Sequence, residues 1–282
     1  MNTVCFYHGE DFDGIGSAAI VHNFLEAELI PLYRAGPITI IPWNKLSPAS
    51  TVFVCDYTLS PFHNMLKIYD YVENFIWLDH HISALREADT YNVHLLGKRD
   101  IAKAACELTW EWFADAELPW AIKMLGRFDV WDFQKHPQAV SFQYGLKSYK
   151  EAYNPKNIMW AKLLKNDKDT LHQILNRGST ILKYMDVQWE ENLQNAFAVT
   201  FEGHTALALN LIHGGRLAFN HVKDPEEYDI LITFYRKNSV WGVTLFSNKP
   251  NVDVSKIAKK YGGGGHSAAA GFGCESLPFI ET

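Results

Sequence analysis

The sequence predicts an α/β fold, in which a mostly parallel sheet covered by helices is followed by a smaller α+β domain. Short apolar runs alternate with amphipathic segments in the first half of the chain, as in βαβ units. Strand-like runs return in the last part and are followed by a helical segment and four consecutive glycines. A hydrophobic content of 48% and a charged content of 21% are typical of a globular protein with a buried core.

The N-terminal sheet is predicted from three buried strands with helices between them. Each strand is short, rich in β-branched and aromatic residues, and bounded by turn or charged residues, and the three are Thr3–Tyr7, Thr51–Cys55 and Phe75–Leu78. Helical spacing occupies Gly16–Glu28 and Pro61–Tyr71. Because right-handed crossovers through helices join parallel strands, this order favours a mostly parallel sheet.

Further elements complete the first domain, which we expect to span residues 1–135. A fourth strand is expected at Ile38–Pro42, and two helices at Ile101–Phe113 and Trp120–Phe128 close the domain. Residues 136–197 are more polar and are predicted to form a helical connector that contains a long helix over Leu171–Leu193.

Residues 198–282 are predicted to form the smaller α+β domain. The strand-like runs are Ala206–Ile212, Asp229–Phe234 and Val240–Phe246, and a helix is expected over Val254–Tyr261. This helix leads directly into the glycine run at residues 262–265.

The net charge argues against long nucleic acid as a ligand. The 282 residues carry 26 Lys and Arg against 32 Asp and Glu, a formal charge of −6. Such a chain lacks the basic surface that holds long nucleic acid by counterion release. If this protein binds phosphates, groups other than Lys and Arg must attract them.

Cysteine usage and the N-terminal residues favour a cytoplasmic protein. The four cysteines show no C-x-x-C spacing, which excludes a zinc ribbon and a thioredoxin-type motif. The first residues lack a basic stretch followed by an apolar run, and no segment approaches the roughly 18 apolar residues of a membrane span. We expect no contact with a membrane.

Acidic and histidine side chains follow all three core strands of the predicted sheet. His8, Asp11 and Asp13 come after the first strand, Asp56 after the next, and Asp79-His80-His81 after the third. Ligands of open α/β sheets bind outside the carboxyl ends of the strands. A single Asp there is usually a helix cap or turn residue, but three strand ends that carry such groups indicate a site.

The mixture of carboxylates and imidazoles favours divalent metal ions. Asp11 and Asp13 point to different sides of an extended loop and could serve two cations, with Asp56 between them. Such ligands suit Mn²⁺ better than a thiolate zinc site or an all-oxygen calcium site, with Mg²⁺ or Co²⁺ as alternatives. Two ions about 3.5–4 Å apart activate water and stabilise the oxygens of a phosphate that is being hydrolysed.

These motifs form one ordered set that extends from residue 3 to residue 273. The set is His8-x-x-Asp11-x-Asp13-Gly14, Asp56, Asp79-His80-His81 and Ile257-Ala258-x-x-Tyr261-Gly262-Gly263-Gly264-Gly265-His266-x-x-Ala269-Ala270-Gly271-Phe272. It closely resembles the DHH/DHHA1 phosphoesterase family. That family contains single-strand-specific exonucleases, oligoribonucleases (nanoRNases) with pAp phosphatase activity, cyclic-dinucleotide phosphodiesterases and exopolyphosphatase-like proteins.

The resemblance implies a metal-ligand set. His8, Asp11 and Asp56 would bind one ion, and Asp13, Asp56, His80 and one further aspartate would bind the second. For this last ligand we choose Asp129, and Asp132 is the alternative. Asp79 would accept a hydrogen bond and orient a ligand without contacting metal.

The resemblance also implies the substrate contacts. His81 would bind the substrate phosphate, and His266 would donate to a phosphate oxygen or to the leaving group. Gly262, Gly263, Gly264 and Gly265 would let the backbone approach an anion closely and turn its N–H groups toward it. The active site would then lie in the cleft between a DHH domain and a DHHA1-like domain, with Asp56, His80, His81 and His266 as catalytic residues.

The sequence departs from the family at one position. Many nucleotide-cleaving relatives carry an arginine near Phe246-Ser247, so one expected contact with substrate is missing. The possible substitutes are Arg99, Arg127, Arg216 and Lys249, although such residues are more often solvated surface charges. Aromatic residues that could stack a base are Trp131, Trp241, Phe246 and Phe272, although core packing is the commoner role.

The predicted function is therefore a divalent-metal-dependent phosphodiesterase or phosphatase. Its expected substrates are short single-stranded oligonucleotides or small phosphorylated nucleotides, and long duplex nucleic acid is not expected. A cyclic-dinucleotide phosphodiesterase and an exopolyphosphatase are the alternatives within the enzyme class. A non-catalytic nucleotide-binding scaffold on the same fold is the alternative outside it.

Overall fold

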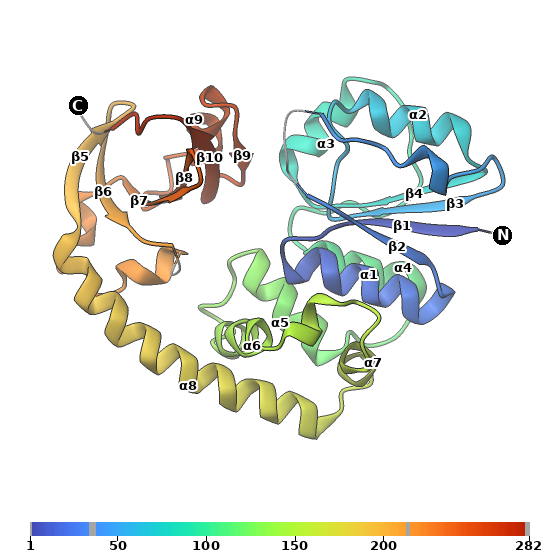
Figure 1. The fold of residues 1–282 in the computed structure, drawn as a ribbon, viewed down its shortest axis with the longest axis horizontal. Coiled ribbons are helices and arrows are strands. Elements are labelled where there is room, and N and C mark those ends of the chain that lie inside the picture. Colours follow the sequence, from blue (N-terminus) through green and yellow to red (C-terminus); the bar gives the residue numbers. More distant parts are fainter. Residues whose placement is uncertain (1, 34–37, 213–214, 280–282) are drawn as a thin grey trace. The chain divides into compact units, whose positions relative to one another are not determined.

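The computed structural model describes residues 2–33, 38–212 and 215–279. The chain forms two compact units, Met1–Leu182 and Lys183–Thr282. Figure 1 shows the elements of both units.

The first unit is built on a four-stranded parallel sheet with strand order β2-β1-β3-β4. The strands are β1 (Thr3–His8), β2 (Glu28–Leu32), β3 (Thr51–Cys55) and β4 (Asn74–Leu78). One face is covered by α1 (Phe12–Leu25) and α4 (Ala105–Phe113), and the other by α2 (His63–Tyr71) and α3 (Ile82–Asp89) (Figure 1). Two apolar clusters, one on each face, hold these layers together.

The predicted strand at Ile38–Pro42 is wrong. These residues form no strand, and Ile40 is 87% exposed. The edge position next to β1 is taken by Glu28–Leu32, a segment that includes Pro31. Proline weakens the pattern of a strand, but an edge strand tolerates it because the sheet needs only one row of its hydrogen bonds.

Helices that follow the sheet pack into the first unit. They are α5 (Trp120–Asp129), α6 (Gln138–Lys147), α7 (Ile158–Leu164) and α8 (Lys168–Asn192). Phe142, Trp160 and Ile174 from three of these helices share an apolar cluster with α1. The two units divide inside α8, whereas the sequence set residues 136–197 apart as a connector. The buried faces of α6 and α7 explain this difference.

The second unit contains a mixed six-stranded sheet with strand order β5-β6-β7-β8-β10-β9. The strands are β5 (Phe197–Phe201), β6 (His204–Asn210), β7 (Ile230–Lys237), β8 (Val240–Ser247), β9 (Gly264–Gly265) and β10 (Ala269–Cys274). Among the described strand pairs of this second sheet, β6–β7 is parallel and the others are antiparallel. The helix α9 (Val254–Lys260) packs on this sheet through Val254, Ile257 and Ala258.

Short 3₁₀ turns occupy Trp43–Lys45, Lys150–Tyr153, Leu193–Asn195, Gly215–Phe219 and Pro225–Glu227. None of the helices in the described part of the chain is both long and apolar enough to cross a bilayer.

Two glycines allow α6 and α8 to cross closely. A Cβ atom at Gly145 would lie 2.0 Å from the carbonyl oxygen of Ile174, and one at Gly178 would lie 1.7 Å from that of Ser141. Neither backbone oxygen can move without a shift of its helix. The contact therefore requires glycine at both positions.

Gly178→Ala is expected to destabilise the first unit by about 1–3 kcal/mol, because overpacking forces the two helices apart. Gly16→Ala is the matched control, since its Cβ would meet neighbours only at 3.4 Å or more. The control should stay within about 1 kcal/mol of the wild type because alanine favours a helix interior. Urea unfolding monitored by far-UV circular dichroism measures both, and equal stability of the two variants would contradict the close crossing.

Candidate metal centre

The carboxyl ends of β1, β3 and β4 bring the acidic and histidine side chains of the sequence motifs together. β1 ends at His8, Asp56 directly follows β3, and Asp79-His80-His81 directly follows β4. Within the first unit, their potential ligand atoms gather in the groups His8–Asp11–Asp56, Asp13–His80–Asp129 and Asp56–Asp79–His81, and the atoms within each group lie within 4.8 Å of one another. The first two groups are the candidate metal sites, because Asp79 in the third has hydrogen-bond donors on both of its oxygens.

The first group is built by the turn between β1 and α1. Asp11 caps α1, and its Oδ1 accepts hydrogen bonds from the backbone N–H groups of Asp13 and Gly14, both at 3.1 Å. Its Oδ2 lies 2.8 Å from Nδ1 of His8. Gly14 is required here, because a Cβ atom would lie 2.1 Å from the carbonyl oxygen of His8.

Nδ1 of His8 is buried and makes no hydrogen bond within the described part of the chain. It nevertheless lies 2.8 Å from Oδ2 of Asp11. The distance is short enough for a hydrogen bond, but the angles between the two groups are not those of one. Ligands that are adjacent around one octahedral ion lie about 3 Å apart, given bonds of about 2.1 Å. The spacing therefore fits two ligands of a shared cation.

Asp13 is held by the start of α4. The residue is only 3% exposed, and its two carboxylate oxygens accept hydrogen bonds from the backbone N–H groups of Ala105 (2.8 Å) and Cys106 (2.6 Å). The N-terminus of a helix favours a negative charge at this position. These bonds fix the carboxylate with Oδ2 at 3.4 Å from Nε2 of His80.

Asp56 lies between the two groups. Its Oδ2 is 3.5 Å from Nδ1 of His8, whereas its Oδ1 is 3.4 Å from Nε2 of His80. The residue is 2% exposed, adopts a left-handed backbone conformation with φ of 54°, and leaves Oδ1 without a hydrogen bond. Backbone strain of this kind clusters at functional sites. The geometry is that of a carboxylate which can bridge two cations.

Asp129, and not Asp132, joins the second group. Oδ2 of Asp129 lies 3.2 Å from Nε2 of His80 and makes no hydrogen bond among the described residues. Asp132 instead pairs with Lys135 at 3.2 Å and with Arg127 at 3.6 Å. The last residue of α5 thus places its carboxylate in the second group, while the loop after it turns Asp132 toward basic side chains.

A buried ion pair positions α5. The carboxylate of Glu107, which is 5% exposed, accepts hydrogen bonds from the guanidinium of Arg127 and from the N–H of Ala104. A Cβ atom at Gly126 would lie 2.4 Å from Cδ of Glu107, so only glycine lets α5 approach. α4 therefore holds Asp13 directly and places Asp129 through this pair. Glu107 could not be predicted as part of this arrangement, because in the sequence it resembles an ordinary surface residue of a helix.

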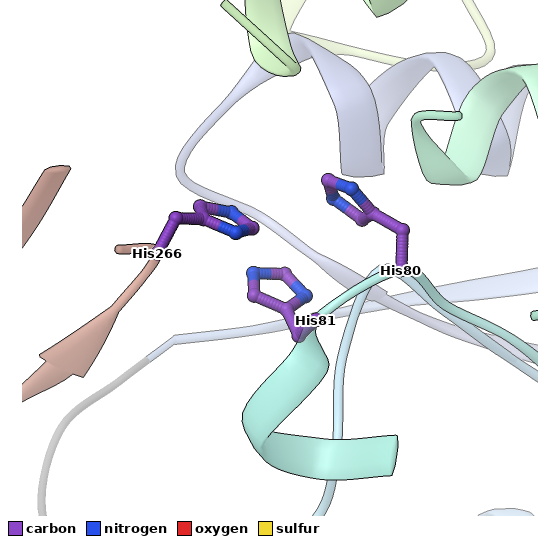
Figure 2. A group of neighbouring side chains, drawn as sticks. All are labelled: His80, His81 and His266. Atoms are coloured by element: carbon purple, nitrogen blue, oxygen red, sulfur yellow. The ribbon is translucent and has the colours of Figure 1, made fainter. Parts of the chain in front are cut away.

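Asp79 orients His81, and both of its carboxylate oxygens have hydrogen-bond partners. Its Oδ1 accepts from the N–H groups of His80 (2.7 Å) and His81 (3.0 Å) and lies 2.8 Å from Nδ1 of His81. Its Oδ2 accepts from the hydroxyl of Thr58 and from the indole N–H of Trp77. The rings of His80 and His81 lie 4.8 Å apart at the junction of β4 and α3 (Figure 2).

The buried carboxylates of the two groups would be stabilised by positive charge, as the pKa values of their side chains show. Burial opposes a charged imidazole, but Asp11 and Asp56 outweigh it and raise the pKa of His8 to about 11. The pKa of His80 is likewise raised to about 11, by Asp56, Asp13 and Asp129 against the effect of burial. Burial and the charge of Asp56 raise the pKa of Asp13 to about 7. Burial and the neighbouring carboxylates also raise the pKa of Asp129 well above its usual range.

The glycine run lies in the second unit, in the hairpin formed by β9 and β10. The N–H groups of Gly262 and Gly263 donate to carbonyls of α9, and that of His266 donates to Ala269. These amides are thus engaged within the unit, unlike the anion-directed amides that the sequence led us to expect. A Cβ atom at Gly264 would meet no atom within 4 Å, so the fold of this unit does not require glycine there. Figure 2 shows His266 on the turn that joins the two strands.

The basic residues proposed as substitutes for the missing arginine all have partners in the structure. Arg99 donates to the carbonyls of Trp77 and Leu95, and Arg127 pairs with Glu107. Arg216 donates to Asn248, and Lys249 pairs with Glu226. Of the aromatic candidates, Phe246 and Phe272 are buried, at 4% and 7% exposed.

No family model matches the chain. Uncharacterized protein R106 of Acanthamoeba polyphaga mimivirus is 25% identical over 307 residues, which cover 99% of this chain and 70% of that protein. The DHH domain of a member of a family of ribosomal proteins superposes with a TM-score of 0.57 at 14% identity, over 96% of this chain and 82% of that one.

An exopolyphosphatase-related protein from Bacteroides fragilis gives a TM-score of 0.48 at 12% identity, over 98% of this chain and 87% of that one. The parallel sheet with its helices and the mixed-sheet second unit are the fold of DHH-domain proteins. The α/β fold class that the motifs predicted is confirmed.

Asp56→Asn is expected to weaken Mn²⁺ binding at both groups by more than about tenfold, because one side chain faces both. Asp132→Ala is the control and should retain both affinities, since its carboxylate pairs with Lys135. Titration of Mn²⁺ monitored by electron paramagnetic resonance measures the number of sites and their affinities. If Asp56→Asn lost only one ion and left the other unchanged, a bridging Asp56 would be ruled out.

Metal binding is expected to release protons near pH 7. The pKa values of His8 and His80, both raised to about 11, leave both rings protonated without metal, and each must lose a proton to become a ligand. Affinity should therefore rise with pH, by about tenfold per unit for each proton released. Calorimetry in buffers of different ionisation enthalpy counts the protons, and binding without any release would contradict this ligand set.

Proposed function

We propose that this chain is a divalent-metal-dependent phosphoesterase that hydrolyses short oligonucleotides or small phosphorylated nucleotides. The observation that carries the proposal is the pair of ligand groups with Asp56 between them, 3.5 Å from His8 of one group and 3.4 Å from His80 of the other. Each group presents carboxylate and imidazole atoms at the spacing of metal ligands. Orphaned buried atoms on His8, Asp56 and Asp129 support the same assignment, because a cation would satisfy all three.

The residues present suit two divalent ions, with Mn²⁺ as the preferred metal and Mg²⁺ or Co²⁺ as alternatives. When bound, such ions activate water and neutralise charge on the oxygens of a phosphate. His8, Asp11 and Asp56 would hold one of them, and Asp13, Asp56, His80 and Asp129 the other. The absence of cysteine from both groups within the described residues disfavours a structural zinc site.

His81 would bind the phosphate of the substrate. Its Nδ1 is held by Asp79, so its Nε2 would donate to a non-bridging oxygen. The Asp79 carboxylate outweighs the effect of burial and raises the pKa of His81, which favours the cationic form that an anion needs. Asp79 acts through His81 and is a positioning residue.

His266 and the glycine run of the second unit would complete the substrate site, as the family resemblance implies. Glycine at 264 is not required by packing, which is consistent with a position that a ligand approaches. His266 would donate a proton to the leaving group or a hydrogen bond to the phosphate. A short substrate also agrees with the net charge of −6, because two divalent ions concentrate positive charge where the phosphate lies.

A hydrolysis panel tests the proposal. With Mn²⁺, the protein is expected to release mononucleotide from a dinucleotide or a five-mer, or phosphate from pAp, and to be inactive with a chelator. Asp56→Asn should lower kcat by at least about a thousandfold, because loss of the metals removes electrostatic stabilisation of the transition state. Asp132→Ala should stay near the wild-type rate.

Cyclic dinucleotide and polyphosphate are included in the same panel, read by product. If either is hydrolysed faster than the dinucleotide, the five-mer and pAp, the proposed substrate class is wrong but the assignment as a phosphoesterase stands. Nucleotide binding without any product, on all substrates and with Mn²⁺ bound, would overturn the enzyme in favour of a scaffold.

A further inference from the structure

A cavity of about 190 Å³ lies beside the second ligand group, within the first unit. Asp13 and Asp129 line one end of it. The remaining wall comes from the start of α1, from α5 and α6, and from the turn after α6. Its volume is below the roughly 300–1,000 Å³ of pockets for whole drug-sized ligands, so it has room for one ring system.

Gln143 of α6 contributes a buried amide to this cavity. The residue is 6% exposed, and its side chain makes no hydrogen bond to any residue in the described part of the chain. No residue in the described part of the chain supplies this amide with a donor or an acceptor, so water or a ligand that enters the cavity must do so.

Lys147 lies one helical turn further along the same face of α6. Its ammonium lies over the ring of Phe128, 5.9 Å from the ring centre, and Phe128 also lines the cavity. The residue is exposed to solvent. The lining of the cavity therefore includes a neutral amide and one cation.

Three aromatic side chains and Leu125 form the apolar part of the wall. The rings of Phe12 and Tyr153 lie 5.0 Å apart, and both residues line the cavity together with Phe128. Flat apolar surfaces next to a donor–acceptor pair are the features by which proteins bind a nucleobase, through stacking and through hydrogen bonds to its edge.

We propose that this cavity binds the nucleobase of the nucleotide whose phosphate lies at the metal centre, and that Gln143 and Lys147 bind the polar edge of that base. The inference rests on the proposed function and restricts it to substrates with a base. A second phosphate fits less well, because Lys147 is the one basic residue among the described residues of the lining and Glu10, which is not a candidate ligand of either ion, would repel an anion. An uncharged ring with polar edges avoids that repulsion.

The test compares binding of AMP and GMP with binding of ribose 5-phosphate, which has the same phosphate and sugar but no base. With Mn²⁺ present, calorimetry of the wild type should give affinity for AMP or GMP at least about tenfold above that for ribose 5-phosphate. Gln143→Met removes the amide at similar volume and should abolish most of this preference. Gln138→Met, at an exposed position of the same helix, is the matched control and should retain it.

Lys147→Met provides a second variant at an exposed position, where misfolding is not expected, and should lose part of the preference. The proposal is overturned if the wild type binds the three ligands equally or binds none of them. It is also overturned if neither variant changes the preference for a nucleotide over ribose 5-phosphate. The same holds if Gln143→Met lowers the affinity for ribose 5-phosphate by the same factor as the affinity for the nucleotides.

Measurements of turnover distinguish a failure of the proposed base site from a failure of the proposed enzymatic function. If the wild type shows the base preference but hydrolyses no substrate of the panel, the cavity assignment stands and the enzyme assignment fails. If it hydrolyses dinucleotide and polyphosphate equally well and binds the three ligands alike, the enzyme stands and the base site fails. For an active enzyme, Gln143→Met should raise KM for a dinucleotide more than it lowers kcat.

Discussion

Burial of carboxylates at the end of the parallel sheet is the constraint on which the rest of the first unit depends. Asp13, Asp56 and Asp79 are 3% exposed or less, and a carboxylate removed from water is unfavourable unless hydrogen bonds or cations compensate it. Asp79 obtains its compensation from backbone and side-chain donors. Asp13 obtains part of it from α4, and Asp56 keeps one oxygen without a donor. Divalent ions would compensate the negative charge that remains on Asp13 and Asp56.

The same constraint fixes the helices around the sheet. Because α4 must begin at the carboxylate of Asp13, its N-terminal N–H groups cannot point elsewhere. Glu107 in the first turn of α4 then binds Arg127, and Gly126 permits the approach of α5. α5 in turn ends with Asp129 beside His80. These contacts link Asp13 to Asp129 through α4 and α5. They fix the relative positions of two candidate ligands that lie 116 residues apart in the sequence.

The strand ends could be predicted from the sequence because parallel strands place their carboxyl ends at one edge, whatever the details of packing. This rule was enough to group His8, Asp56 and His80 and to anticipate the α/β fold. The edge strand β2 and the domain limits could not be predicted in this way. Pro31 disguises the strand, and only packing in the core shows that Phe142 belongs to the first unit.

The choice between Asp129 and Asp132 depends on where a helix ends, which is the least certain feature of a sequence pattern. Gln143 and Lys147 carry no signal at all, because a glutamine and a lysine four residues apart on a helix normally face solvent. Their interest comes only from a cavity that α1, α5 and α6 form together. The candidate metal ligands at the strand ends and the proposed base contacts on a helix thus come from separate elements. If both assignments hold, substitutions on α6 would change which substrate is bound while the strand ends keep the same metals.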